Sequence, residues 1–320
     1  MIRTGIMIEG QEGLTWQRWR RIAETVEALG FESLWRSDHL FSLFDVPTRP
    51  GLDTWSSLTA LALITRRLRF GPLVSPITFR HPAMLAREAA AVDALSGGRL
   101  ELGMGAGWHD REHQAFGIPY PRVGERIRRL DEGIRVVRAL WSDGPAHFEG
   151  RFYRLDGAVG WPKPVQKPRI PLVVGGKGPR VLEVVARHAD EWNTAGSRPP
   201  ADVRARTEML EAACHRAGRD PREIRHSWMG AFLIGETGAD LERRARKIQE
   251  YVPPRAAWPA AKLPDVLRSE GWLVGSPAEI VGQVRALAAV GIERVMLQFF
   301  DQEDLDALHM LAEQVVPRLS

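Results

Sequence analysis

Residues 69–109 read RFGPLVSPITFRHPAMLAREAAAVDALSGGRLELGMGAGWH and contain a strand, a helix and a second strand in that order. Residues 69–74 and 100–104 are short and apolar, as buried strands are, whereas apolar residues recur at helical spacing over residues 84–95. Gly97 and Gly98 follow this helix at once, where glycine commonly ends a helix. The segment is therefore predicted to be a βαβ unit with parallel strands.

The same alternation continues in both directions along the chain. About eight strand–helix units in about 300 residues predict an α/β fold, specifically a (β/α)8 TIM barrel with insertion segments at its C-terminal rim. A doubly wound open sheet is the structural alternative, but GIMIEGQEG at residues 5–13 lacks the G-x-G-x-x-G dinucleotide pattern. We expect one domain over residues 1–320, with insertions at about 143–169 and 252–275. Strands are expected at 4–8, 33–37, 69–74, 100–104, 170–174, 191–194, 224–234 and 293–299.

The composition excludes several classes of protein. The chain has 320 residues, a net charge of +4 and a single cysteine, Cys214, so an internal disulfide is impossible. One cysteine favours a reducing compartment, and with no signal peptide recognisable we expect a cytoplasmic protein. The basic residues are scattered rather than gathered on one face, which argues against nucleic acid as a partner. No apolar stretch reaches the roughly 18 residues of a membrane helix.

Polar and glycine-rich clusters follow four of the expected strands. Asp38 and His39 follow the second strand, Ser75 the third, Gly105-Ala106-Gly107 the fourth and Gly175-Gly176-Lys177-Gly178 the fifth. Function in such barrels gathers at the C-terminal ends of the strands, so these clusters share one predicted rim. Glycines before a helix suit an anion such as phosphate, although a tight strand-to-helix turn explains them as well.

The Asp38-His39 pair is the strongest candidate for chemistry. A histidine beside a carboxylate is able to hold or move a proton near neutral pH. A structural histidine bonded to a loop carbonyl is the alternative, and without further context it is the favoured one.

These segments together resemble the bacterial luciferase-like superfamily, specifically its deazaflavin (coenzyme F420)-dependent oxidoreductases. The resemblance lies in SLWRSDHL at 33–40, in residues 73–121, in PLVVGGKGPRVLEVVARHADEWN at 171–193 and, more weakly, in residues 275–297. It covers nearly the whole chain in the expected order.

The resemblance implies hydride transfer by coenzyme F420, whose acidic polyglutamate tail suits the surplus of arginine. It implies that Asp38 contacts the cofactor and that His39 transfers a proton or orients the substrate, and we assign both as catalytic. It also implies a non-proline cis peptide at Leu73–Val74, against the back of the cofactor ring; Ser75–Pro76 offers an alternative cis bond. The cofactor-binding residues implied are Asp38, Val74, Ser75, Ala106, Gly107, Trp108, Gly175, Gly176, Lys177, Gly178 and Pro179.

The expected substrate is a small organic molecule, contacted by Trp108, His109, Trp272 and Gln298. The sugar-phosphate dehydrogenases of this family carry a glutamate where this chain has Trp108, and a tryptophan near Leu43, so glucose 6-phosphate is disfavoured. Glu112 is expected to cap the following helix or to touch the cofactor. For Arg80 we weigh an ion pair with a carboxylate beneath the site against a surface salt bridge.

Two other functions stay open at this point. The GGKGPR loop at 175–180 suits an FMN phosphate equally well, so an FMN-dependent monooxygenase of the same superfamily is the alternative enzyme. A barrel that binds a cofactor without turnover is the third reading. A homodimer is expected, because the helices at 54–65 and 84–95 have apolar faces and the resembled family often pairs through its early helices. No metal is expected.

Overall fold

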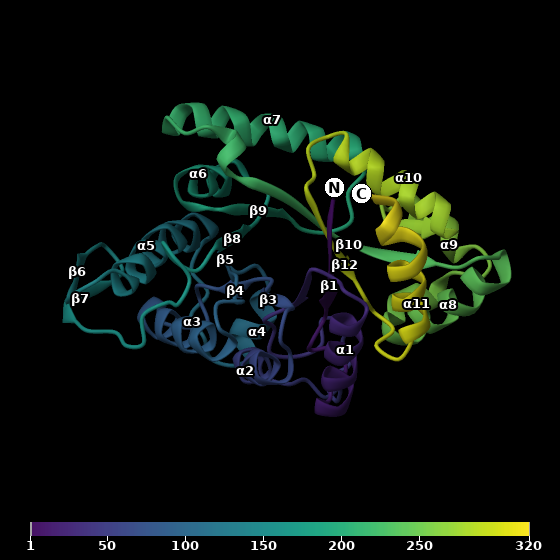
Figure 1. Cartoon of the computed structure of the whole chain (residues 1–320), viewed down its shortest axis with the longest axis horizontal. Helices are drawn as coiled ribbons and strands as arrows, with labels where there is room; N and C mark the ends of the chain where they lie inside the picture. The colour runs from purple at the N-terminus through teal and green to yellow at the C-terminus, as the bar shows by residue number, and fades with distance from the viewer. Residues whose placement is uncertain (1, 320) are drawn as a thin grey trace.

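The computed structural model describes residues 2–319 and confirms the predicted α/β barrel. Strands alternate with helices through most of the chain, and the strands gather at the centre of the molecule with the helices around them (Figure 1). The strands are β1 (Arg3–Ile8), β2 (Ser33–Arg36), β3 (Arg69–Pro72), β4 (Ser75–Pro76), β5 (Leu102–Gly105), β6 (Ala146–Glu149), β7 (Arg154–Ala158), β8 (Leu172–Gly175), β9 (Glu191–Thr194), β10 (Arg225–Ile234), β11 (Leu273–Gly275) and β12 (Arg294–Gln298). The α-helices are α1 (Trp16–Ala28), α2 (Thr54–Ile64), α3 (Pro82–Ser96), α4 (Asp110–Ala115), α5 (Val123–Trp141), α6 (Pro179–His188), α7 (Pro200–Ala217), α8 (Gly238–Tyr251), α9 (Leu263–Ser269), α10 (Pro277–Ala288) and α11 (Leu305–Met310).

The central sheet is parallel and nearly closed. Its strand order is β3-β2-β1-β12-β10-β9-β8-β5-β4. β3 and β4 are two pieces of one chain segment, separated by Leu73 and Val74, whose shared peptide bond is cis as the resemblance implied. Phe70 of β3 bridges to Leu100, just before β5, and brings the two ends of the sheet together. This closure excludes the doubly wound open sheet.

The inside of the barrel changes character from one end to the other. Its middle is filled by a small apolar cluster that includes Met7, Trp35 and Met296. At the end where the strands begin, the fully buried Arg294 donates to Glu101 at 2.7 Å and to Glu191 at 2.9 Å. We call this end the floor and the opposite end, where the strands finish, the rim.

Local sequence explains where the helices begin and end. α3 begins after His81 with a proline in its first turn, and it ends at Gly97, which adopts the left-handed conformation (φ +68°) that glycine reaches without steric cost. α10 begins with a capping box in which Ser276 and Glu279 satisfy each other's backbone amides. The starts of α3 and α10 are the positions at which two rim loops end and the outer helices begin.

The two irregular stretches differ from one another. Within the insertion expected at about 143–169, residues 146–158 form an antiparallel hairpin, β6–β7, outside the barrel sheet, and it lies beside α5 at the edge of the molecule (Figure 1). Residues 252–275 are more ordered than expected, because they hold the short helices η2 (Pro253–Ala257) and α9 and the strand β11, which pairs with β10. After β12 the chain continues with α11, a π-helical turn (η3, Leu311–Val315) and a 3₁₀ turn (η4, Val316–Leu319).

The two ends of the described chain meet near the floor of the barrel. The amide of Ile2 donates to the carbonyl of Leu319 at 3.3 Å. Over residues 2–319, no helix combines the length and the apolar character that crossing a membrane requires.

Candidate active site

Asp38 lies at the rim just beyond β2, and its carboxylate is held from two sides. Ser75 donates its hydroxyl to Oδ2 at 2.7 Å, and Arg80 donates to the same oxygen at 2.5 Å and to Oδ1 at 3.4 Å. Asp38 is buried, so this charge needs its guanidinium partner. Arg80 therefore pairs with a carboxylate beneath the site, the first of the two interpretations offered by the sequence.

His39 forms the second polar pair of the rim. Its Nδ1 lies 2.7 Å from Oε2 of Glu112, while Oε1 of Glu112 accepts the amide of Leu40 at 2.5 Å. Burial disfavours the imidazolium, but the hydrogen bond and charge of Glu112 outweigh it and raise the pKa of His39. Burial likewise opposes ionisation of Glu112, and the contact with His39 nevertheless lowers its pKa. The pair favours a charged imidazolium beside a charged carboxylate.

Glu112 thus has a different role from the helix cap that the sequence favoured. It lies in the first turn of α4 and is fully buried. Instead of the amides of its own helix, it binds a side chain and an amide of the loop after β2. The contact joins residues 73 positions apart in the sequence, so no local sequence pattern predicts it.

Aromatic rings surround this pair. The rings of Trp108 and His39 meet edge to face at 5.7 Å between centroids, and His109 lies 6.3 Å from His39. Trp108 is 65% exposed, an unusual position for a tryptophan, while His109 is mostly buried with Nδ1 3.3 Å from Glu112. The rim therefore presents an exposed aromatic face directly beside the proton-holding pair.

Glycines on β5 and β8 leave room around Val74. A Cβ on Gly105 would lie 2.5 Å from Val74 Cγ2, and one on Gly175 would lie 3.1 Å from Val74 Cγ1. Gly107 has φ +77°, and a Cβ there would meet the hydroxyl of Thr78 at 2.8 Å. Val74 therefore fills the space that side chains at Gly105 and Gly175 would occupy, and it packs directly against the backbone of β5 and β8.

The loop after β8 has the properties of an anion site. Gly178 caps α6 without any side-chain hydrogen bond to the helix amides, and Lys177 is exposed beside them. Burial, together with the positive charges of Arg198 and Arg206, lowers the pKa of Lys177. Arg206 also donates to the carbonyl of Lys177 at 3.1 Å. Lys177 and the uncapped start of α6 fit a phosphate group, while Arg198 and Arg206 add positive charge but also pair with Asp202 at 3.5 Å.

The loop after β1 holds polar residues that the sequence reasoning passed over. Glu9, Gln11 and Glu12 are all buried at the rim. Gln11 donates to Glu9 at 2.8 Å, and the predicted substrate residue Gln298, at the end of β12, donates to the other oxygen of Glu9. The rule that led to Asp38 and His39 applies equally to β1 and would have found Glu9.

Glu12 shapes the neighbouring loop instead of facing the barrel axis. It accepts the hydroxyl of Ser42 at 2.8 Å, the amide of Leu43 at 2.7 Å and the guanidinium of Arg49 at 2.5 Å. These bonds fix the segment that follows Asp38 and His39. Glu12 therefore helps to fix the loop that carries Asp38 and His39.

Trp272 lies in a separate apolar cluster formed by α8, α9 and β11. Its ring stacks on Phe300 with centroids 5.3 Å apart, and Phe44 from the loop after β2 packs beside Phe300. The structure thus does not gather Trp272 into the group around His39. Its assignment to the substrate stays a prediction.

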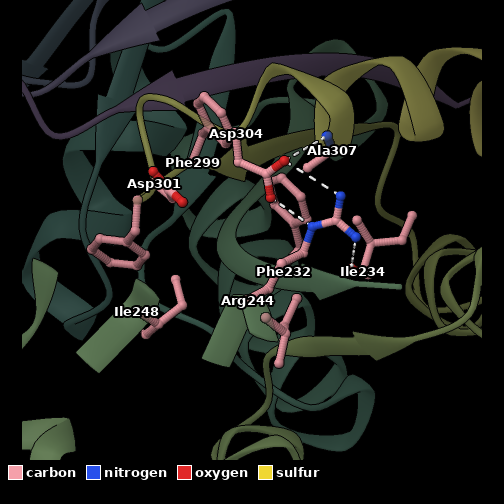
Figure 2. A pocket seen from close by; sticks show the side chains of 10 residues that line it. Phe232, Ile234, Arg244, Ile248, Phe299, Asp301, Asp304 and Ala307 are labelled. Carbon is pink, nitrogen blue, oxygen red and sulfur yellow. Dashed lines mark hydrogen bonds and ion pairs between the residues drawn. The ribbon is translucent and has the colours of Figure 1, made fainter. Parts of the chain in front are cut away.

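A small cavity of about 20 Å³ opens next to this cluster, between β10, α8 and the end of β12 (Figure 2). Arg244 closes it by donating to Asp304 at 2.6 Å and to the carbonyl of Ile234 at 3.1 Å, as the dashed lines in Figure 2 show. The volume suits about one water molecule, so the cavity is no site for a cofactor or substrate.

The structure brings most of the predicted residues to one end of the barrel. Asp38 and Ser75 touch, and His39, Trp108 and His109 form one group with Glu112. Among residues 2–319, no group of histidine, cysteine and carboxylate side chains is suited to a metal ion. The available chemistry is proton exchange at His39, at the same rim as Val74 between its two glycines and the cationic loop after β8.

Fold and site together define a parallel barrel with its functional groups on the C-terminal rim. The family model for luciferase-like monooxygenases matches residues 2–294. The chain therefore belongs to the luciferase-like monooxygenase family.

Relatives in this family divide by cofactor. The chain is 28% identical over 312 residues to an F420-dependent glucose-6-phosphate dehydrogenase of Kineococcus radiotolerans, covering 93% of this chain and 91% of that one. It is 24% identical over 316 residues to an FMNH2-dependent dimethylsulfone monooxygenase of Pseudomonas putida, covering 90% and 84%. An uncharacterised protein of Mycobacterium tuberculosis is 36% identical over 170 residues, a match that spans 53% of this chain and only 58% of that protein.

Solved structures support the same fold. An F420-dependent secondary alcohol dehydrogenase, in complex with an F420-acetone adduct, superposes with a TM-score of 0.84 at 20% identity, over 100% of this chain and 99% of that one. At this level of identity the likeness concerns the fold.

Proposed function

We propose that this protein is a coenzyme F420-dependent oxidoreductase that transfers a hydride between the deazaflavin and a small organic substrate. The proposal is supported by the full-length similarity to F420-dependent dehydrogenases and by the rim chemistry of this chain. The observation that carries it is the His39–Glu112 pair at the same rim as Val74, which packs against the glycines of β5 and β8.

The chain's own residues have distinct tasks in this proposal. When bound, the deazaflavin supplies a hydride acceptor and donor at C5 of its ring. Val74, packed against Gly105 and Gly175, would lie against the ring, and the uncapped start of α6 with Lys177 would hold the phosphate. Asp38, fixed by Ser75 and Arg80, shapes the ring's surroundings.

His39 handles the proton that accompanies the hydride. Because Nδ1 is hydrogen-bonded to Glu112, Nε2 is the ring nitrogen left to exchange a proton with an oxygen or nitrogen of the substrate. Reduction of a carbonyl or imine consumes a proton, and the raised pKa of His39 keeps one available near neutral pH. In the reverse direction, the neutral ring takes the proton from an alcohol.

Binding of F420 and FMN to the apo protein, followed by fluorescence with oxygen excluded, tests this proposal. We expect the deazaflavin to bind with micromolar or tighter affinity and FMN to bind much more weakly. Screening of ketones, imines, alkenes and alcohols for F420 turnover would then follow. Tight binding of FMN with weak binding of F420 would refute the proposal and favour the monooxygenase chemistry of the Pseudomonas relative. Tight F420 binding without any turnover would favour a barrel that binds without catalysis.

A further inference from the structure

A groove runs down the outside of the barrel between α5 and α6 and is bounded by the β6–β7 hairpin. Its volume is about 410 Å³, within the range of sites that hold small ligands. Along α5 it extends over the twelve residues from Gly124 to Arg135, about 16 Å of helix. Nothing in the chemistry described above uses this groove.

Four arginines of the groove have no anionic partner. Within residues 2–319, no carboxylate oxygen lies within 4 Å of the guanidinium nitrogens of these side chains, which are Arg128, Arg135, Arg151 and Arg180. All four are exposed to solvent. Arg128 and Arg135 are two turns apart on α5 and so present the same face of that helix.

The acidic side chains of the groove are already engaged by other groups. Asp131 accepts Arg187 at 2.8 Å and His188 at 2.9 Å. Glu132 accepts two backbone amides of the hairpin, and Glu183 pairs with Arg216 at 3.1 Å. The groove therefore carries an excess of positive charge, five arginines against three carboxylates, of which only Glu132 has no cationic partner among the described residues. Such a surface recognises a chain of several carboxylates or phosphates.

The rim end of the groove adjoins two glycine-containing loops, the one after β5 and the one after β8. Arg180 is the second residue of α6, directly after the Gly176–Pro179 loop, and one of its nitrogens would lie 3.0 Å from a Cβ on Gly124. On the α5 side, Arg126 reaches back to donate to the carbonyl of Gly107 at 3.3 Å. A ligand whose phosphate sits at the start of α6 therefore has its next segment at the mouth of the groove.

We propose that this groove binds the oligoglutamate tail of the deazaflavin cofactor, with Arg128 and Arg135 as its main carboxylate contacts. The inference rests on the proposed function, because FMN ends at its phosphate and has no such tail. It assigns residues outside the barrel to cofactor recognition. It also gives the exposed arginines of α5 a role that barrel stability does not require.

The test compares two deazaflavins that differ only in the tail. One carries several glutamates, and the other ends at the phosphate-linked unit with none. Fluorescence quenching at low ionic strength measures both dissociation constants for the wild-type protein and for the R128Q/R135Q variant. We expect the tail to tighten wild-type binding about three- to tenfold, a gain that the double variant and added salt both remove. Affinity for the tail-less compound should stay unchanged.

The matched control is R20Q/R222Q, which removes the same charge from α1 and from the short η1 turn (Pro221–Glu223), far from the groove in sequence. It should bind both compounds as the wild type does. Equal affinity of the wild type for the two deazaflavins would overturn the groove assignment and leave the proposed function intact. Failure of the wild type to bind either compound would refute the proposed function itself, so the two failures are distinguishable.

Discussion

Replacing Glu112 by glutamine tests the proton-handling role of His39 most directly. The substitution preserves the shape of the side chain and an oxygen for the amide of Leu40, but it removes the negative charge from the 2.7 Å contact with His39. Burial then dominates at His39, so the pKa of the imidazole falls and the ring loses its proton at neutral pH. A hydrogen bond to a charged group contributes about 1.5–3 kcal/mol, which corresponds to a loss of about 10- to 150-fold in rate.

The assay is the pH dependence of F420-linked reduction under single-turnover conditions. Because the folded protein raises the pKa of His39, the protonated ring persists to higher pH, and the wild-type rate falls only as pH rises through that raised value. In E112Q the same fall should come at lower pH. In the H39N variant the rate should show no such fall with rising pH.

Two controls separate this effect from damage to the fold. Cofactor affinity and the thermal midpoint of E112Q should remain close to those of the wild type, since the substitution is nearly isosteric. If E112Q keeps both the wild-type rate and the wild-type pH profile, His39 is not the proton donor and the reasoning fails.

Three further substitutions probe stability and the cofactor cradle. R294M removes the buried guanidinium that three glutamates share at the floor and leaves each of them only one outer arginine, so urea titration should show a loss of about 3–5 kcal/mol in unfolding free energy. The hydrogen bond from His188 holds the pKa of Asp131 to about 2, so this group stabilises the fold above its ordinary pKa and ceases to do so as pH falls towards 2. D131N should therefore lose about 1–2 kcal/mol at pH 7, and its urea midpoint should change less than that of the wild type between about pH 5 and pH 2. G105A places a methyl group 2.5 Å from Val74 Cγ2, so calorimetry should show cofactor affinity about tenfold weaker with the circular dichroism spectrum retained.

The barrel could be predicted because it depends on features that are local in sequence. The glycine pair at 97–98 ends α3 as expected, and the predicted strand at 224–234 differs by one residue from β10. β11 was missed because three residues in a proline-rich stretch carry no period, and only the edge of β10 makes them a strand.

The site could be predicted only in part, for the same reason. Asp38 and His39 were found because each strand of a parallel barrel delivers its following residues to the same rim. Their partners were not, because Glu112 and Ser75 reach them across 73 and 37 positions of sequence. Such contacts depend on the closure of the barrel and not on any spacing along the chain.

The pattern of charge pairing separates structural groups from functional ones. At the floor, Arg294 donates to three glutamates and so retains little capacity to bind a ligand. Asp38 is committed in the same way to Ser75 and Arg80. Of the two ring nitrogens of His39, only Nδ1 has a hydrogen-bond partner within residues 2–319. The four groove arginines have no carboxylate partner among the same residues. Exposed arginines need no partner for stability, so what distinguishes these four is that they line one groove whose end lies at the rim. This arrangement is the one expected if the cofactor and substrate lie at the rim and along that groove.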